Sequence, residues 1–335
     1  MKKLILSVAM LCVTGIFYAQ TTFSTNNPFY SSSGQWASEV SAQAAPDESP
    51  CVDCEVDQIV RMTYNPYDTE NMSLINQTGD RNDANVFQTG QVNYSAVNQD
   101  GYSGLIEGFD NDANVYQEGD RNYSDVGQHG EFNQGDVIQI GNDNYSMQNV
   151  GTGWAEYNSA YVRQEGDGNA SSQTQWYDGN DAKIEQLTDN NEATQIQTST
   201  NTHMAGTGNS ASIWQYGGDD NVAFQEQTGT KNSAFSEQNG MGNTSKSTQS
   251  GIGNSGDGIY SNFARTLQIG DNNLACVDQD GGMLGANGSW IYQLGNDNKA
   301  GVSQETSASG WGNLSYISQY GNSNTASVTQ INGSN

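Results

Sequence analysis

The sequence has few positive charges and few hydrophobic residues. Its 335 residues carry 38 acidic side chains against 11 lysines and arginines, a formal net charge of −27. Such a chain has little with which to neutralise phosphates, so nucleic acid is not an expected partner. Only 34% of the residues are hydrophobic, and after the N-terminus no stretch is apolar enough to span a bilayer.

Low hydrophobicity is also typical of disordered chains. Disorder does not explain why the 17 tyrosines, 9 phenylalanines and 6 tryptophans follow a periodic pattern. A fixed period over hundreds of residues instead indicates a repeat architecture.

Proline is missing from most of the chain. All four prolines, Pro28, Pro46, Pro50 and Pro66, precede residue 71. Because proline cannot donate a hydrogen bond to a strand ladder, its absence from 71–335 fits one continuous sheet structure.

The first 20 residues resemble a secretory signal peptide. Lys2 and Lys3 precede the apolar run LILSVAMLCVTGIF, and we expect cleavage near Ala19 or Gln20. A membrane anchor is the alternative, although the run is short. The sequence thus predicts a signal peptide (1–20), a non-repetitive and flexible segment used in export (21–70), and a repeat domain (71–335).

Cysteine is too scarce for a disulfide framework. Cys12 lies in the signal, which leaves Cys51, Cys54 and Cys276. We expect a local disulfide between Cys51 and Cys54, with a redox or metal motif as the alternative.

From residue 71 the chain repeats the pattern Asn-x5-Gln with a step of 11 residues. The stretch NDANVFQTGQVNYSAVNQDG, residues 82–101, contains two copies. There are 21 units, and only one, ending at Val150, lacks the glutamine. Representative asparagine and glutamine residues of the pattern are Asn82, Gln88, Asn93, Gln99, Asn122, Gln128, Asn169, Gln175, Asn180, Gln186, Asn232, Gln238, Asn273, Gln279, Asn298, Gln304, Asn324 and Gln330.

Alternate positions of each unit differ in character. Positions 1, 3, 5 and 7 hold Asn, a small residue, mostly Val or Ile, and Gln, and none of them is charged. Positions 2, 4 and 6 hold every other kind of side chain. This period of two predicts a strand with one dry and one wet face. Gly with Asp or Asn then forms a tight turn.

A strand this short cannot bury enough surface alone. When equivalent strands stack, each buried amide finds partners in the strands above and below, so Asn and Gln ladders form. Without those partners each buried amide would cost a few kcal/mol. The sequence therefore predicts an all-β solenoid whose fold depends on stacked copies.

The positions of insertions set the length of one coil. Extra residues follow only odd-numbered units, apart from one residue after Gln215. The units that carry longer insertions end at Gln99, Val150, Gln197, Gln249, Gln279 and Gln304. Insertions confined to one edge predict a 22-residue rung of two strands and two turns, and about ten rungs.

This rung makes a specific prediction about position 5. Successive odd units hold Gln148, Gln173, Gln195 and Gln225, and the even units between them hold Val162, Ile184 and Ile213. We expect a glutamine ladder on one sheet to face an aliphatic row on the other.

The repeat resembles that of the curlin family, the subunits of curli amyloid fibres. The segments QTGDRNDANVFQ (Gln77 to Gln88) and QEGDRNYSDVGQ (Gln117 to Gln128) carry the resemblance. It implies a secreted β-solenoid that polymerises into adhesive extracellular fibres of the biofilm matrix at the bacterial cell surface. It also implies a nucleator subunit and an outer-membrane export pore as partners.

Other classes of function find little support. His129 and His203 belong to no readable catalytic arrangement, so we expect no enzyme and no cofactor. The acidic turns are expected to be solvated, with calcium binding as the alternative. Outward aromatic residues, Tyr94, Tyr116, Trp214, Phe224, Phe235 and Trp290, could bind surfaces or pack on neighbours. The alternative function is a non-polymerising solenoid that acts as a surface adhesin or ice-binding module.

Overall fold

The computed structural model describes residues 59, 70–100, 108–152, 155–199, 208–252, 262–281, 286–307 and 312–332. All of these belong to one compact unit of the chain. The predicted signal peptide, Cys51, Cys54 and nearly all of the predicted segment 21–70 lie outside the described residues. Every regular element in the described part is a β-strand, and that part contains no helix able to cross a membrane.

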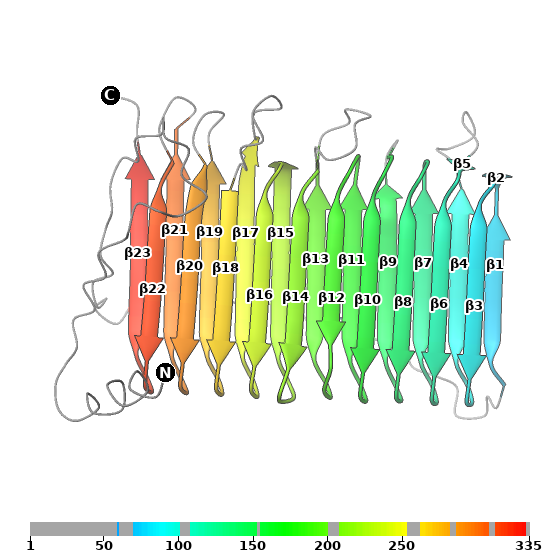
Figure 1. The fold of residues 1–335 in the computed structure, drawn as a ribbon, viewed down its shortest axis with the longest axis horizontal. Helices are drawn as coiled ribbons and strands as arrows, with labels where there is room; N and C mark the ends of the chain where they lie inside the picture. Colours follow the sequence, from blue (N-terminus) through cyan, green and yellow to red (C-terminus); the bar gives the residue numbers. More distant parts are fainter. Residues whose placement is uncertain are drawn as a thin grey trace, which may run out of the picture. The chain divides into compact units, whose positions relative to one another are not determined.

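Two parallel sheets contain almost all of the strands (Figure 1). The larger sheet has 11 strands in the order β1 (Met72–Gln77), β4 (Tyr94–Asp100), β7 (Tyr123–His129), β9 (Tyr145–Thr152), β11 (Ala170–Trp176), β13 (Glu192–Thr198), β15 (Val222–Thr230), β17 (Thr244–Ile252), β19 (Leu274–Gly281), β21 (Lys299–Thr306) and β23 (Thr325–Asn332).

The smaller main sheet has 10 strands and runs beside the first. Its order along the stack is β3 (Asp83–Thr89), β6 (Asp112–Glu118), β8 (Gln134–Ile140), β10 (Ser159–Glu165), β12 (Asp181–Gln186), β14 (Ser210–Tyr216), β16 (Ser233–Asn239), β18 (Asn262–Ile269), β20 (Asn287–Leu294) and β22 (Leu314–Tyr320). Two short strands, β2 (Gly79–Asp80) and β5 (Gly108–Phe109), pair with each other.

The register confirms the predicted rung. Odd units fill the 11-stranded sheet and even units fill the 10-stranded sheet. Gln173 is opposite Gln195 in the pairing of β11 with β13, and Ile184 is opposite Ile213 in that of β12 with β14. One coil is therefore two strands, and the two sheets together make about ten rungs, as predicted.

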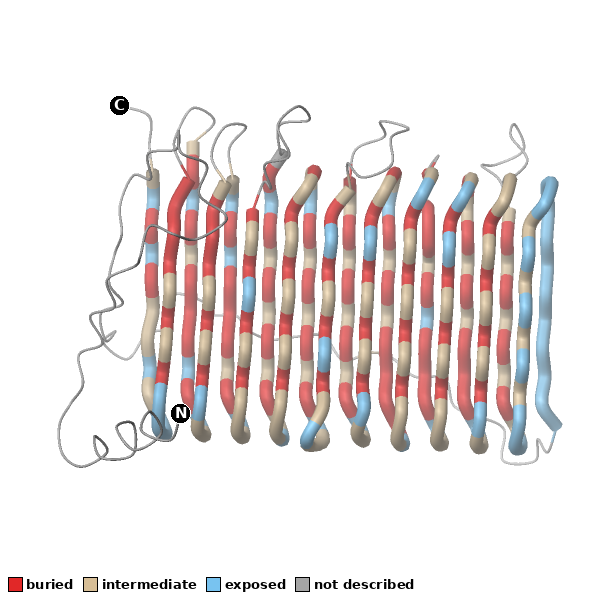
Figure 2. The backbone as a smooth tube through the Cα atoms, in the orientation of Figure 1, coloured by how far each residue is buried: buried red, intermediate tan, exposed pale blue. Residues whose placement is uncertain are grey.

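Burial alternates along the strands, which appear banded in Figure 2. In β10, the residues at positions 3, 5 and 7 are buried and those between them are not. Val162, Ile184 and Ile213 form one apolar cluster with Ala193 and Ala223 of the opposite sheet. The predicted dry face is thus the narrow space between the two sheets, and the predicted aliphatic row lies there.

The two edges of the solenoid differ. We call the edge where strands of the 10-stranded sheet lead into the 11-stranded sheet the tight edge. The opposite edge, where strands of the 11-stranded sheet lead into the 10-stranded sheet, is the insertion edge. Each of the longer predicted insertions falls on the insertion edge, whereas all connections of the tight edge are short and described, including the one with the extra residue after Gln215.

Candidate functional site

Glutamines at position 7 form a ladder along each sheet. Gln164 Nε2 donates to Gln186 Oε1 at 2.9 Å, and Gln186 Nε2 donates to Gln215 Oε1 at 2.9 Å. The same Gln186 amide also donates to the carbonyl of Ala170 in the opposite sheet, at 3.1 Å. Each such glutamine thus joins neighbouring rungs and ties the two sheets together.

The ladders have a direction. From Gln88 to Gln117 at one end (2.8 Å) and from Gln293 to Gln319 at the other (2.9 Å), Nε2 donates to the oxygen one rung nearer the C-terminus. The two ends of the stack are therefore chemically different.

Asparagines at position 1 form a second ladder beside each turn. The backbone N and the Nδ2 of Asn144 both donate to Asn122 Oδ1 at 3.1 Å. Asn144 Nδ2 also donates to the carbonyl of Gly166 at 2.8 Å. The side chain therefore fixes its own turn and the position of the next rung.

The predicted position-5 ladder is present. Gln148, Gln173, Gln195 and Gln225 are joined by Nε2–Oε1 bonds of 3.0, 2.9 and 3.0 Å. The ladder ends where Gln225 donates to Ser236 Oγ of the opposite sheet, at 3.2 Å.

Where a ladder is interrupted, a buried acceptor oxygen has no hydrogen-bond donor. Gln175 Oε1 has no hydrogen-bond partner in the described structure, because the preceding strand presents Val150 at that position. Gln148 Oε1 has none either, since Val126 precedes it. A buried oxygen without a donor costs about 1–3 kcal/mol, so continuity of the ladder is what makes an amide interior stable.

The representative ladder residues predicted from the sequence all lie in these columns. Most are completely buried, and those in the terminal strands are more exposed. The members are Asn82, Gln88, Asn93, Gln99, Asn122, Gln128, Asn169, Gln175, Asn180, Gln186, Asn232, Gln238, Asn273, Gln279, Asn298, Gln304, Asn324 and Gln330.

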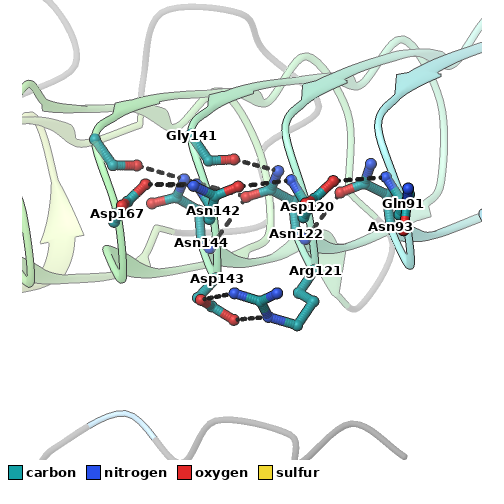
Figure 3. A network of polar contacts seen from close by, with 11 residues as sticks. Gln91, Asn93, Asp120, Arg121, Asn122, Gly141, Asn142, Asp143, Asn144 and Asp167 are labelled. Atoms are coloured by element: carbon teal, nitrogen blue, oxygen red, sulfur yellow. Dashed lines mark hydrogen bonds and ion pairs between the residues drawn. The ribbon is translucent and has the colours of Figure 1, made fainter. Parts of the chain in front are cut away.

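The tight edge carries a further ladder that the sequence analysis missed (Figure 3). Asp120 Oδ1 accepts the backbone N–H of Gln91 at 2.8 Å, and Asp167 Oδ1 accepts that of Asn142 at 2.8 Å. Asp120 is partly buried and Asp167 is exposed, so both carboxylates still meet solvent while they accept these bonds. In the described part of the chain no cluster of His, Cys, Asp or Glu residues could hold a metal ion.

Glycine is required at these turns for two reasons. Gly119 has φ +112°, a conformation that side chains with Cβ avoid. A Cβ built on Gly119 would lie 2.0 Å from the carbonyl oxygen of Gly141 in the next rung. There is no room for a side chain at this position because the next turn stacks directly on it.

Outward aromatic residues of adjacent strands stack on one another along each sheet. Tyr123 stacks between Tyr94 and Tyr145 with ring centroids 5.0 and 4.9 Å apart. Trp214 meets Phe235 edge-on, and Lys246 lies over the Phe224 ring. The structure thus supports packing on neighbours as one use of these side chains.

The remaining polar candidates give no catalytic arrangement in the described part of the chain. His129 lies against the carboxylate of Asp100, and both side chains are partly exposed. His203, Cys51 and Cys54 lie outside the described residues. Cys276 forms a disulfide whose other cysteine also lies outside them.

The N-terminal end of the stack exposes inward positions, whereas at the C-terminal end Ile317 and Val328 are buried. Ile75 of β1 occupies position 5 and is 43% exposed, whereas Ile184, at the same position inside the stack, is completely buried. Within the described part, β1 and β23 each pair with one strand only. Both edges offer backbone groups to an incoming strand, and the β1 edge also offers its inward side chains.

Comparison with known proteins agrees with this architecture. The curlin associated repeat model matches residues 108–131, 260–305 and 309–331. No curated protein shows significant similarity to the chain. The chain therefore carries curlin associated repeats in these three regions, which supports a curlin-family repeat protein.

Proposed function

We propose that this protein is a secreted subunit that polymerises end on into extracellular fibres of an adhesive biofilm matrix. The observation that carries the proposal is the state of the β1 end, where the inward side chain of Ile75 is exposed, together with strand edges that have one neighbour only at both ends of the described stack. A second copy would bury this side chain as an internal rung buries Ile184. Long, uncovered strand edges are templates for addition of another chain.

The amide ladders explain why addition would be favourable. Each new rung gives the terminal amides the partners that Gln164, Gln186 and their neighbours already have inside the stack. A neighbouring copy also covers part of the exposed apolar surface of β1, where Met72 is 55% and Leu74 is 53% exposed. Burial of apolar surface and completion of the ladders act in the same direction.

The route to the cell surface is part of the proposal. The signal-like residues 1–20 would direct secretion, and residues 21–70 would be recognised by an outer-membrane export pore of the curli type. A separate nucleator subunit would start the fibre. The strongly acidic composition suits a chain that must stay soluble until it reaches the fibre end. Curlin-repeat solenoids form a structural family and not an enzyme family.

Polymerisation can be tested with the mature chain, without residues 1–20. After removal of denaturant, we expect thioflavin fluorescence to rise with time and electron microscopy to show unbranched fibres. A soluble monomer that stays unassembled at high concentration would instead favour the adhesin or ice-binding alternative.

A matched pair of end variants sharpens the test. Ile75→Glu places a charge on the inward face of β1, and Asn76→Glu places one on its outward face next door. Added to preformed wild-type fibres, Ile75→Glu should fail to extend them, whereas Asn76→Glu should extend them at nearly the wild-type rate. Equal extension by both would show that the β1 edge is not the site of growth.

A further inference from the structure

The two main sheets contain different numbers of strands. The described part of the chain has 11 strands in one sheet and 10 in the other. The path of the chain alternates between the sheets, so the strand that follows β23 in a continuous solenoid must lie beside β22, in the 10-stranded sheet. The next must lie beside β23.

We propose that successive copies in the fibre are rotated by half a turn, so that the 10-stranded sheet of one copy continues into the 11-stranded sheet of the next. This inference rests on the proposed function, because it describes the joint of the polymer. In that joint β1 of the incoming copy pairs with β22, and β3 pairs with β23. The partner is a second copy of this chain.

The inward residues of the two ends match in this arrangement. Ser315 and Ile317 of β22 meet Ser73 and Ile75 of β1. Ala326 and Val328 of β23 meet Ala84 and Val86 of β3 in the same way. Asn and Gln occupy positions 1 and 7 on both sides, so all four inward positions are identical across both strand pairs.

The match extends beyond the terminal strands. In the 10-stranded sheet, Ser289 and Ile291 of β20 already precede Ser315 and Ile317. In the 11-stranded sheet, β19, β21 and β23 all carry Ala at position 3 and Val at position 5. Columns of identical side chains therefore reach each edge and continue on the other copy after a half turn.

The outward residues agree as well. Met72 of the incoming β1 lies beside Leu314, and Leu74 lies beside Tyr316, so exposed apolar side chains meet apolar ones. On the other pair, Thr325 meets Asp83 and Ser327 meets Asn85.

The turns and ladder polarity fit the same joint. The turn that links β22 to β23 contains Gly321 and Asn322, and it would stack on Gly79 and Asp80, which link β1 to β3. Gly321 has φ +97° and Gly79 has φ +111°, the conformation shared by the stacked turns. Among the described residues, the atom nearest to a Cβ built on Gly321 is Asn324 Nδ2 at 3.8 Å, whereas a Cβ built on Gly295 lies 2.1 Å from Gly321 O. Head-to-tail addition also preserves the donor direction of the glutamine ladders.

Addition without the half turn fits less well. β23 would then pair with β1, which sets Ala326 against Ser73 and Val328 against Ile75. β22 would face β3 across a gap the width of one strand, ~4.8 Å. The edges of both strands would stay unpaired inside the fibre.

Photo-crosslinking can distinguish the two joints. The photoreactive residue p-benzoylphenylalanine replaces either Ser318 in β22 or Thr329 in β23. Both positions are outward position 6 of their strands. Fibres of each variant are irradiated, digested with trypsin and analysed by mass spectrometry. Cleavage at Arg81 separates β1 from β3 into different peptides, 62–81 and 82–121.

With the half turn, most of the intermolecular crosslink from position 318 should be to peptide 62–81, and most of that from position 329 to peptide 82–121. The reverse assignment, or intermolecular crosslinks to neither peptide, would overturn the half-turn joint while leaving polymerisation intact. If the unmodified chain forms no fibres, the proposed function fails and this inference fails with it.

Discussion

The inward and outward side chains of the same strands follow different rules. In β12, inward Ala182 and Ile184 each meet a side chain of the same kind in both neighbouring strands, β10 and β14. Outward Lys183, between them, meets Tyr161 on one side and Ser212 on the other. Lys183 is next to Ala182 and Ile184 in the strand, and only the direction of its side chain differs from theirs.

This contrast shows which positions repeat strictly within the chain. An inward side chain lies in a closed space between two sheets, where its only partners are the equivalent side chains of adjacent rungs and the opposite sheet. An outward side chain can be satisfied by water as well. Repetition is therefore strict where a rung must serve as the partner of the next rung, and loose where solvent can take that place.

A charge placed on each face should give the largest contrast. Ile184→Glu buries a carboxylate with no cation beside it and should destabilise the solenoid by about 4 kcal/mol or more. Ile138→Glu makes the same change on the outward face, beside Arg163, and should cost less than about 1 kcal/mol. Denaturant midpoints followed by circular dichroism, at concentrations that prevent assembly, measure both. Similar midpoints would mean that the inward face is not dry.

The turn glycines extend the contrast to the tight edge. Gly119→Ala forces a Cβ against the carbonyl of Gly141 and strains a left-handed backbone, so we expect a loss of about 3 kcal/mol. Gly127 lies in β7 at an outward position, and the nearest atom to a built Cβ is 3.6 Å away. Gly127→Ala should leave thermal stability nearly unchanged. A tolerated alanine at 119 would show that the stacked turns can separate.

Removing one amide from an inward ladder should have a smaller effect. Gln195 accepts from Gln173 and donates to Gln225, so Gln195→Leu disturbs both neighbours and should cost about 1–3 kcal/mol. Gln134 is exposed, and its side-chain Nε2 donates to Asp136 Oδ2 on the surface. Gln134→Leu is the control and should change the unfolding free energy by about 0.5 kcal/mol at most. If the two variants unfold at the same denaturant concentration, the ladder contributes no more than surface hydrogen bonds.

The same ladder can be repaired where it is broken. Val150→Gln supplies a donor to Gln175 Oε1, which is buried without a partner. We expect stabilisation of about 1 kcal/mol, seen as a higher midpoint of denaturation. Val150→Leu fills a similar volume without an amide and should bring no such gain. Equal effects of the two substitutions would assign the gain to packing.

Partly buried outward carboxyls should produce the smallest effect. Burial raises the pKa of Asp125, although a hydrogen bond from Tyr123 opposes this. The folded state then holds a proton more tightly than the unfolded chain, so stability falls as pH rises above about 4 through the folded pKa. Asp125→Asn should remove this part of the pH dependence and raise stability near pH 7 by about 0.5 kcal/mol. An unchanged slope of unfolding free energy against pH would exclude Asp125 as a source.

Much of the fold followed from the sequence because the pattern is redundant. The 22-residue rung came from the positions of insertions, and the Gln173–Gln195 pairing confirms it. The inward ladder residues were identifiable because the same amide recurs in nearly every unit.

Other features could not be read from the sequence. Whether Asp120 faces water or the backbone N–H of Gln91 depends on how closely adjacent turns stack, which no single turn motif specifies. The bond from each position-7 glutamine to a carbonyl of the opposite sheet depends on the distance between the sheets.

X-ray diffraction from aligned fibres of the mature chain shows whether copies add end on. If copies add end on and continue the strand ladder, the strand spacing lies along the fibre axis, and we predict a sharp meridional reflection at ~4.7–4.8 Å. Fibres that lack this meridional reflection, or that show it only across the axis, would contradict end-on stacking of the solenoid.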